Sequence, residues 1–274
     1  MSRRLKNLIF FTIPGFLLSL IILLPLYMMI MNSFKDRQGA AVTNLRLPDV
    51  WQIIENYSEV IHIGKLGLGF LNSMIITFSS VALILLLTSA AAFVIQRRSG
   101  KGIAFVSTMI ILGLIVPLSI IPTTFLLKYL GLLGTYFGTI LVYVATCIPF
   151  SVFIYTGFYR TIPRALDEVA TLDGCGPFRL YFQVIFPLVK PATLTILIAN
   201  FMTVWNDLNI VIYLINTPSK YTAVMTTYLF YGQYNSSWNL VFADIILISL
   251  PVVILYLFLQ KYIVSGMTAG SIKG

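Results

Sequence analysis

Long apolar stretches dominate the chain, and short polar segments separate them. A helix needs about 20 consecutive, mostly apolar residues to span the hydrocarbon core of a bilayer. Six stretches reach this length, at residues 8–31, 70–95, 103–127, 137–158, 192–215 and 238–260. The pattern predicts an all-α integral membrane protein whose six transmembrane helices form a single transmembrane domain over residues 1–274.

The composition supports membrane embedding. Apolar residues make up 58% of the chain and charged residues 10%, whereas soluble domains contain about 45–50% and about 25%. A soluble fold of this size could not cover so much apolar surface. The first stretch follows Arg3, Arg4 and Lys6 as in a signal peptide, but it is too long and lacks a cleavage pattern, so we expect a retained first span.

Lysine and arginine residues are distributed unequally between the two sides of the predicted spans. With the N-terminus inside, the outer segments hold six of the eighteen basic residues: Lys35, Arg37, Arg46, Lys65, Lys128 and Lys220. The other twelve fall on inner segments, where short loops of membrane proteins concentrate lysine and arginine. We therefore interpret the formal net charge of +9 as a topology signal that places both termini in the cytoplasm.

The segment 159–191, between the fourth and fifth predicted spans, is patterned as two short amphipathic helices. Thr161 is expected to cap the first helix, and Gly174 is expected to end it in a left-handed conformation. The second helix should run from 178 to 186 and end before the fifth span, at Pro187 and Pro191. Its apolar stripe would consist of Phe178, Tyr181, Phe182 and Ile185. Two interpretations fit this pattern: a docking element on the cytoplasmic face, or a pair of helices lying on the lipid headgroups.

The same segment resembles the EAA loop of ABC importer permeases. Residues 168–174 read E-V-A-T-L-D-G and are followed by Ile185-Phe186-Pro187. The positions of the motif are kept by Glu168, Ala170, Gly174 and Pro187. The departures are Val169 in place of alanine, a one-place shift of the isoleucine, and Phe186 in place of leucine.

Three further runs resemble the carbohydrate-uptake branch of that family. They are Trp205-Asn206-Asp207 in the fifth span, Leu71-Asn72-Ser73 at the start of the second span, and the tail 260–274. The tail is similar to the ending of maltose-type second permeases. With these runs, the chain resembles a carbohydrate ABC importer inner-membrane permease, maltose-type second permease, of the binding-protein-dependent transport family.

The resemblance implies a type I ABC importer permease fold with a cytoplasmic coupling-helix loop. In that family two homologous permeases form the pore, two ATPase subunits dock below, and an extracytoplasmic sugar-binding protein delivers the carbohydrate. The resemblance assigns ATPase coupling to Glu168, Ala170, Asp173, Gly174 and Pro187. It also implies that the tail touches the ATPase through Gly266, Thr268 and Gly270, the alternative being a flexible tail.

The fifth span carries polar and aromatic side chains that suit a sugar. Asn200, Thr203 and Asp207 recur at helical spacing, and ionisable groups at membrane depth usually face the bundle interior or water. The candidates for the substrate path are Asn200, Thr203, Trp205, Asn206, Asp207 and Tyr213. The alternative is that the polar groups hydrogen-bond between helices without touching solute. The pattern leaves both interpretations open.

The sequence favours a transport subunit over an enzyme. It contains no G-x-x-x-x-G-K-[ST] phosphate loop, so ATP and Mg²⁺ are expected on the partner ATPase and no cofactor on this chain. One histidine, His62, and scattered acids do not supply the convergent groups of a membrane enzyme. A secondary transporter would carry more intramembrane acids and often inverted repeats. We therefore expect a multi-pass permease in the cell (inner or cytoplasmic) membrane of a prokaryote.

Overall fold

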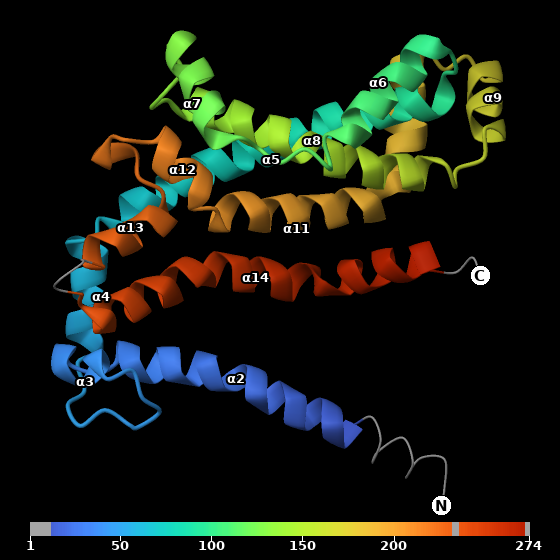
Figure 1. The fold of residues 1–274 in the computed structure, drawn as a ribbon. Helices are drawn as coiled ribbons and strands as arrows, with labels where there is room; N and C mark the ends of the chain where they lie inside the picture. Colours follow the sequence, from blue (N-terminus) through green and yellow to red (C-terminus); the bar gives the residue numbers. More distant parts are fainter. Residues whose placement is uncertain (1–11, 232–235, 272–274) are drawn as a thin grey trace, which may run out of the picture. The chain divides into compact units, whose positions relative to one another are not determined.

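The computed structural model describes residues 12–231 and 236–271, with residues 261–271 described by their backbone only. Helices joined by short loops make up these parts of the chain (Figure 1). The chain divides into two compact units. Unit 1 comprises residues 1–69 and 223–250, and unit 2 comprises residues 70–222 and 251–274.

Unit 1 is built around the first long helix of the described chain. Its elements are α2 (Ile13–Ser33), α3 (Arg37–Ala41), α4 (Ile53–His62), α13 (Ala223–Phe230) and the first part of α14 (Trp238–Ser271). The side chains of α2 are apolar on every side and exposed along most of its length. Such a helix is suited to lipid or to another membrane helix.

A buried polar cluster orders the segment that follows α2. The Lys35 ammonium group donates hydrogen bonds to Asn32 Oδ1 at 2.9 Å and to Asn44 Oδ1 at 2.8 Å. The Asn56 amide donates to the carbonyl oxygens of Ser33 and Lys35 and so attaches α4 to the end of α2. Burial lowers the pKa of Lys35, and the charge of Asp49 opposes this shift.

A second buried polar contact joins α13 to α14. Asp244 is fully buried, and its carboxyl group accepts hydrogen bonds from Thr226 Oγ1 at 3.1 Å and Thr227 Oγ1 at 2.7 Å. Because an unpaired carboxyl group at membrane depth would be costly, these hydroxyls make its burial tolerable.

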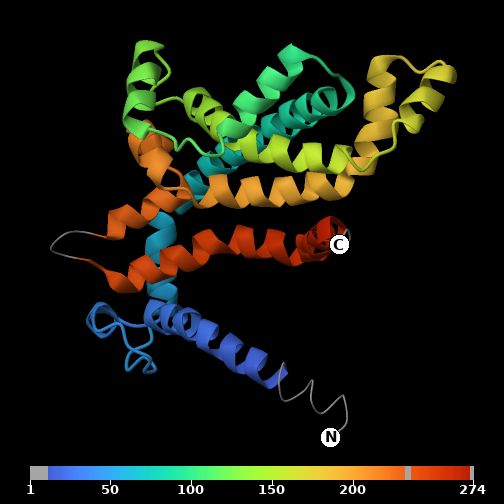
Figure 2. The same cartoon turned by 45° about the vertical axis from the view of Figure 1, so that its right-hand side comes forward.

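Unit 2 contains most of the long helices and the segment 159–191. Its elements are α5 (Leu66–Arg97, from residue 70 onward), α6 (Lys101–Leu112), α7 (Ile120–Tyr129), α8 (Tyr136–Tyr159), α9 (Ala165–Leu172), α10 (Pro177–Arg179), η2 (Leu180–Ile185), η3 (Phe186–Val189), α11 (Lys190–Asn206), α12 (Asn209–Leu214), η4 (Pro218–Lys220) and the end of α14. Figures 1 and 2 show α11 running beside α8. One buried core joins α5, α8, η2 and α11 through Ala92, Tyr155, Ile185 and Ile196.

Within the described residues, five helical segments are long and apolar enough to cross a membrane. They are Ile13–Ser33, Leu66–Arg97, Tyr136–Tyr159, Pro177–Asn206 and Trp238–Gln260. The predicted continuous third span, 103–127, is wrong, because α6 and α7 are separated by a non-helical stretch at residues 113–119. Pro117 explains the break, since it lacks a backbone donor and disfavours the helical conformation of Val116.

The predicted fifth span, 192–215, is also interrupted. Helix α11 ends at Asn206, Asp207 has an extended backbone, and α12 begins at Asn209. The Asp207 side chain accepts a hydrogen bond from the Ile210 N–H at 2.9 Å. Aspartate competes in this way for backbone groups at helix starts, which favours a new helix at this position over a continuous one.

Candidate coupling loop and substrate path

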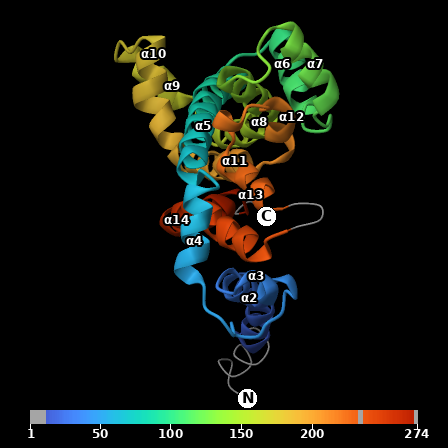
Figure 3. The same ribbon diagram turned by 90° about the vertical axis from the view of Figure 1, so that its left-hand side faces the viewer.

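The segment 159–191 forms a helical hairpin in which α9 lies beside η2 (Figure 3). The predicted cap at Thr161 is wrong. Its hydroxyl donates to the Phe158 carbonyl at 2.8 Å and so finishes α8 instead, while α9 begins only at Ala165. Asp167 and Glu168 lie in the first turn of α9, where the helix dipole favours negative charge.

The corner of the hairpin is a Schellman motif, which confirms the predicted left-handed cap. Gly174 has a φ of +76°. Its N–H donates to the Thr171 carbonyl at 3.0 Å, and the Cys175 N–H donates to the Ala170 carbonyl at 2.9 Å. These two bonds satisfy carbonyls that the end of α9 would otherwise leave unpaired.

The second arm of the hairpin differs from the predicted helix 178–186. After α10 it becomes the π-helical turn η2 and then the 3₁₀ turn η3. Tyr181 and Ile185 are buried, whereas Phe178 and Phe182 are exposed, so the predicted single stripe is wrong. The reason is that a π turn closes with i→i+5 bonds and does not follow the 3.6-residue period.

The prolines of this arm turn the chain without opening a loop. Pro187 lies at the start of η3 and Pro191 in the first turn of α11, where a missing N–H is tolerated. Figures 1 and 2 show that the chain changes direction between η2 and α11. The expected end of the second helix is therefore a helical bend.

A cluster of hydroxyl groups lies in the core beneath the hairpin. Ser89 Oγ in α5 is 2.9 Å from Tyr159 Oη in α8 and 2.7 Å from Tyr181 Oη in η2. The Tyr155 hydroxyl donates to Thr193 Oγ1 in α11 at 3.0 Å. Sequence reasoning missed this cluster, because single hydroxyls inside apolar helices carry no periodic signal.

An ion pair attaches α9 to the end of α5. The Arg97 guanidinium places Nε 2.6 Å from Asp167 Oδ2 and Nη2 3.1 Å from Asp167 Oδ1. The two side chains are 12% and 19% exposed. The sequence analysis used Arg97 only to infer topology and did not predict its contact with Asp167.

The residues assigned to ATPase coupling divide by exposure. Ala170 is buried, and α9 packs against η2. Glu168, Asp173, Gly174 and Pro187 are exposed. Large apolar side chains are exposed on both arms of the hairpin, at Leu172 and Phe178. A polar loop in water would not expose such groups, so this surface is suited to a partner or to the membrane interface.

Three substrate-path candidates are engaged inside unit 2. The Asn200 amide donates to Ser151 Oγ in α8 at 2.9 Å. Asp207 Oδ2 accepts from the Tyr143 hydroxyl at 2.8 Å. Trp205 is buried and stacks on Phe201 with ring centroids 5.5 Å apart. The polar contacts are hydrogen bonds between helices, as in the alternative interpretation of this span. Asp207 lies at the helix break and not on the predicted polar stripe.

The other three candidates are exposed. Thr203 and Asn206 hydrogen-bond to carbonyls of their own helix, at Ala199 and Met202. Tyr213 in α12 is 56% exposed. Thr203 and Asn206 lie in the last turn of α11, and Tyr213 lies in α12 after the break. Exposed polar groups are therefore present on both sides of the break.

Asn72 fastens the loop that follows α12. Its amide group donates to the carbonyls of Ser219 and Tyr221 at 3.1 and 2.8 Å, and its oxygen accepts from the Tyr136 hydroxyl at 2.8 Å. Lys220 donates to the Gly134 carbonyl at 2.7 Å. The Leu71-Asn72-Ser73 run thus marks a structural attachment between α5, α8 and this loop.

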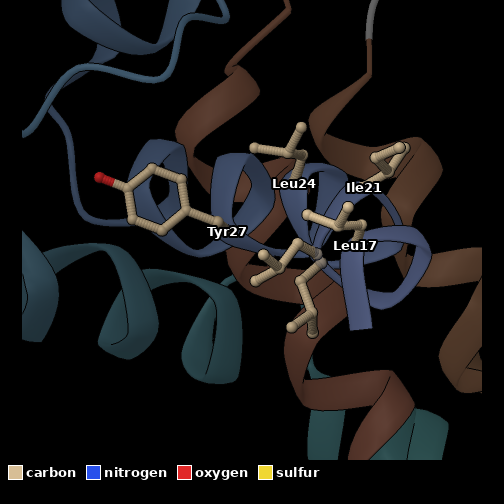
Figure 4. A pocket seen from close by; sticks show the side chains of 6 residues that line it. Leu17, Ile21, Leu24 and Tyr27 are labelled. Carbon is tan, nitrogen blue, oxygen red and sulfur yellow. The ribbon is translucent and has the colours of Figure 1, made fainter. Parts of the chain in front are cut away.

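Two further features involve neither the hairpin nor the interrupted span. The tail candidates Gly266, Thr268 and Gly270 fall in 261–271, so their side chains lie outside the described residues and the tail contact stays a prediction. Figure 4 shows an apolar pocket on α2 that is lined by Leu17, Leu20, Ile21, Leu23, Leu24 and Tyr27. Aliphatic side chains dominate this lining, which suits acyl chains or a helix better than a sugar.

The chain is similar to known proteins along nearly its whole length. A family model described as the binding-protein-dependent transport system inner membrane component matches residues 85–269. The melibiose/raffinose/stachyose import permease protein MelC of Bacillus subtilis (strain 168) is 31% identical, over 100% of this chain and 99% of MelC. The multiple sugar-binding transport system permease protein MsmG of Streptococcus mutans is 33% identical, over 93% of each chain.

A solved structure supports the fold. A chain in the crystal structure of a bacterial ABC transporter involved in the import of the acidic polysaccharide alginate matches with a TM-score of 0.81 and 24% identity. The match covers 96% of this chain and 98% of that chain. The arrangement of helices is therefore that of an ABC importer permease.

Proposed function

Since the chain belongs to the family of binding-protein-dependent transport system inner membrane components, we propose that it forms half of the translocation pore of an ATP-driven oligosaccharide importer. The observation that carries this proposal is the exposed helical hairpin with an EAA-like sequence and a Schellman corner at Gly174. The sugar-import permeases among its relatives support a carbohydrate as the substrate class.

The proposal includes partners that supply what this chain lacks. A separate ATPase binds ATP and Mg²⁺ and docks on the hairpin, where Glu168 and the exposed Leu172 offer one charged and one apolar contact. A second, homologous permease completes the pore, and an extracytoplasmic binding protein delivers the sugar. The tail residues Gly266, Thr268 and Gly270 contact the ATPase as well.

The proposed topology has six crossings, with both termini in the cytoplasm of a prokaryotic cell. The contact between Arg97 and Asp167 supports this topology, because it requires the end of α5 and the start of α9 to lie on the same side of the membrane. Because α8 crosses the membrane once between these two points, the chain must cross once more between the end of α5 and the start of α9. We assign that crossing to α6 and α7 together.

The proposed substrate path passes the break between α11 and α12. Interrupted helices at membrane depth are tolerated where they are covered by protein or line an aqueous path. The exposed Thr203, Asn206 and Tyr213 would face the solute, while Asn200 and Asp207 hold the surrounding helices together.

The test is uptake by the complete complex, purified with its co-expressed partners and placed in liposomes. We expect sugar uptake only with ATP and binding protein present. Glu168→Ala should leave the complex assembled but reduce the amount of sugar taken up per ATP hydrolysed. Thr171→Ala is the matched control, because Thr171 is exposed on the same helix and its hydroxyl donates to the Asp167 carbonyl of that helix. Uptake by this chain alone, without ATP, would instead identify a secondary transporter.

A further inference from the structure

Arg97 and Arg164 join α5 to the hairpin from both directions. Besides its two contacts with Asp167, the Arg97 guanidinium donates through Nη1 to the Ile162 carbonyl at 3.2 Å. Arg164, just before α9, donates to the Gln96 carbonyl at the end of α5 at 3.0 Å. A cation at this place also satisfies a terminal carbonyl of α5 and matches the sign of its dipole.

We propose that the Arg97–Asp167 pair is the connection through which movement of α9 reaches α5. The inference rests on the proposed function, in which the ATPase displaces α9. Both residues are positioning residues, because they act on the geometry of other elements.

The geometry distinguishes this pair from an ordinary surface ion pair. Arg97 Nη2 donates a hydrogen bond to Asp167 Oδ1 at 3.1 Å, and Nε lies close to Oδ2, so the pair combines one charge-assisted hydrogen bond with a second ionic contact. Both side chains are largely shielded from water, so counter-ions weaken the attraction less than at an exposed site. Arg98 carries the same charge one residue further on but is exposed.

Apart from the exposed bond between Arg164 and the Gln96 carbonyl, the remaining attachments of α9 lead elsewhere. The buried face of α9, at Ala170, packs against η2, which continues through η3 into α11. Loss of the ion pair should therefore leave the hairpin folded and joined to α11, while α5, still linked through Arg164, follows its movement less closely. This consequence separates transmission from a purely structural role.

The first experiment compares transport with ATP hydrolysis in the complete complex in liposomes. Arg97→Ala and Asp167→Ala should each lower the sugar taken up per ATP by about tenfold, a coupling within the usual range for contacting residues. The exchanged pair, Arg97→Asp with Asp167→Arg, should recover most of the loss, and Arg98→Ala should match the parent. An unchanged ratio in both single variants would overturn the proposal. So would loss of the ATPase from the purified variants, since Arg97 would then act in docking.

A second measurement does not depend on transport. Spin labels at Val94→Cys in α5 and Thr171→Cys in α9, with both native cysteines replaced by alanine, report the distance between the two helices. We expect a narrow distance distribution in the parent complex and a broad one with Arg97→Ala. A narrow distance distribution in both the parent and the variant complex would overturn the inference. Absence of ATP-driven uptake by the parent complex would contradict only the proposed function.

Discussion

Gly174 shows how one residue sets the shape of the hairpin. Its φ of +76° is a conformation that any residue with a Cβ adopts only with strain. A Cβ added there would meet no atom within 4 Å, so the constraint lies in the backbone and not in space. The sequence could predict the left-handed conformation of Gly174, because a glycine directly after the end of a predicted helix is a local signal.

We predict that Gly174→Ala destabilises the end of α9 by about 1 kcal/mol, the cost of a left-handed residue with a Cβ. Gly176→Ala is the matched control, since Gly176 has a φ of −69° and also meets no atom within 4 Å. Hydrogen exchange at the amides of 174 and 175 should become faster only in the Gly174 variant. Equal exchange in the two variants would show that the left-handed cap does not hold the corner.

At the scale of elements, the Ser89 hydroxyl is the point where α5, α8 and η2 share hydrogen bonds. Two tyrosine hydroxyls hydrogen-bond to this one oxygen. Buried hydroxyls that lose a partner keep their desolvation cost, about 1–3 kcal/mol.

We predict that Ser89→Ala lowers the thermal stability of the purified complex more than Tyr159→Phe, because the serine variant leaves two phenols without this partner. The double variant should cost less than the two single costs added together, since both remove the same bond. Thr156→Ala is the control, as its exposed hydroxyl bonds only to the Phe153 carbonyl within α8. If the decrease in melting temperature of the double variant equalled the sum of the two single decreases, the three hydroxyls would act independently.

The sequence predicted the long apolar segments but missed short helix breaks inside them and contacts between distant residues. Apolar length gave five of the long helical segments, but it could not register the breaks at Pro117 and Asp207, because a hydropathy window averages across them. It placed Asp207 on a helical stripe, whereas the side chain starts the next helix. The partner of Arg97 lies 70 residues away, and no spacing rule connects them.

At the scale of the whole molecule, the proposed topology can be tested with the native cysteines. Cys175 is partly exposed at the corner of the hairpin, while Cys147 is buried in α8. Six crossings with both termini inside place Cys175 on the cytoplasmic side.

We therefore predict that a membrane-impermeant maleimide labels Cys175 in inside-out vesicles and not in intact cells. Ser219→Cys with Cys175→Ser should label from the opposite side, because the loop held by Asn72 lies at the other end of the spans. Labelling of Cys175 from outside would show that the topology is the reverse of the proposed one. Because Arg97 and Asp167 lie on the same side of the membrane, the orientation of α5 would then be reversed as well.

The bend at η3 has a mechanical consequence. Pro187 and Pro191 supply no backbone donor, so the junction between the hairpin and α11 holds fewer backbone hydrogen bonds than a regular helix. The guanidinium–carboxylate attachment to α5 is short and largely shielded from water. Under the proposed function, a displacement of α9 therefore reaches α5 through the ion pair, and a change in the bend at this junction allows α11 to keep its own direction.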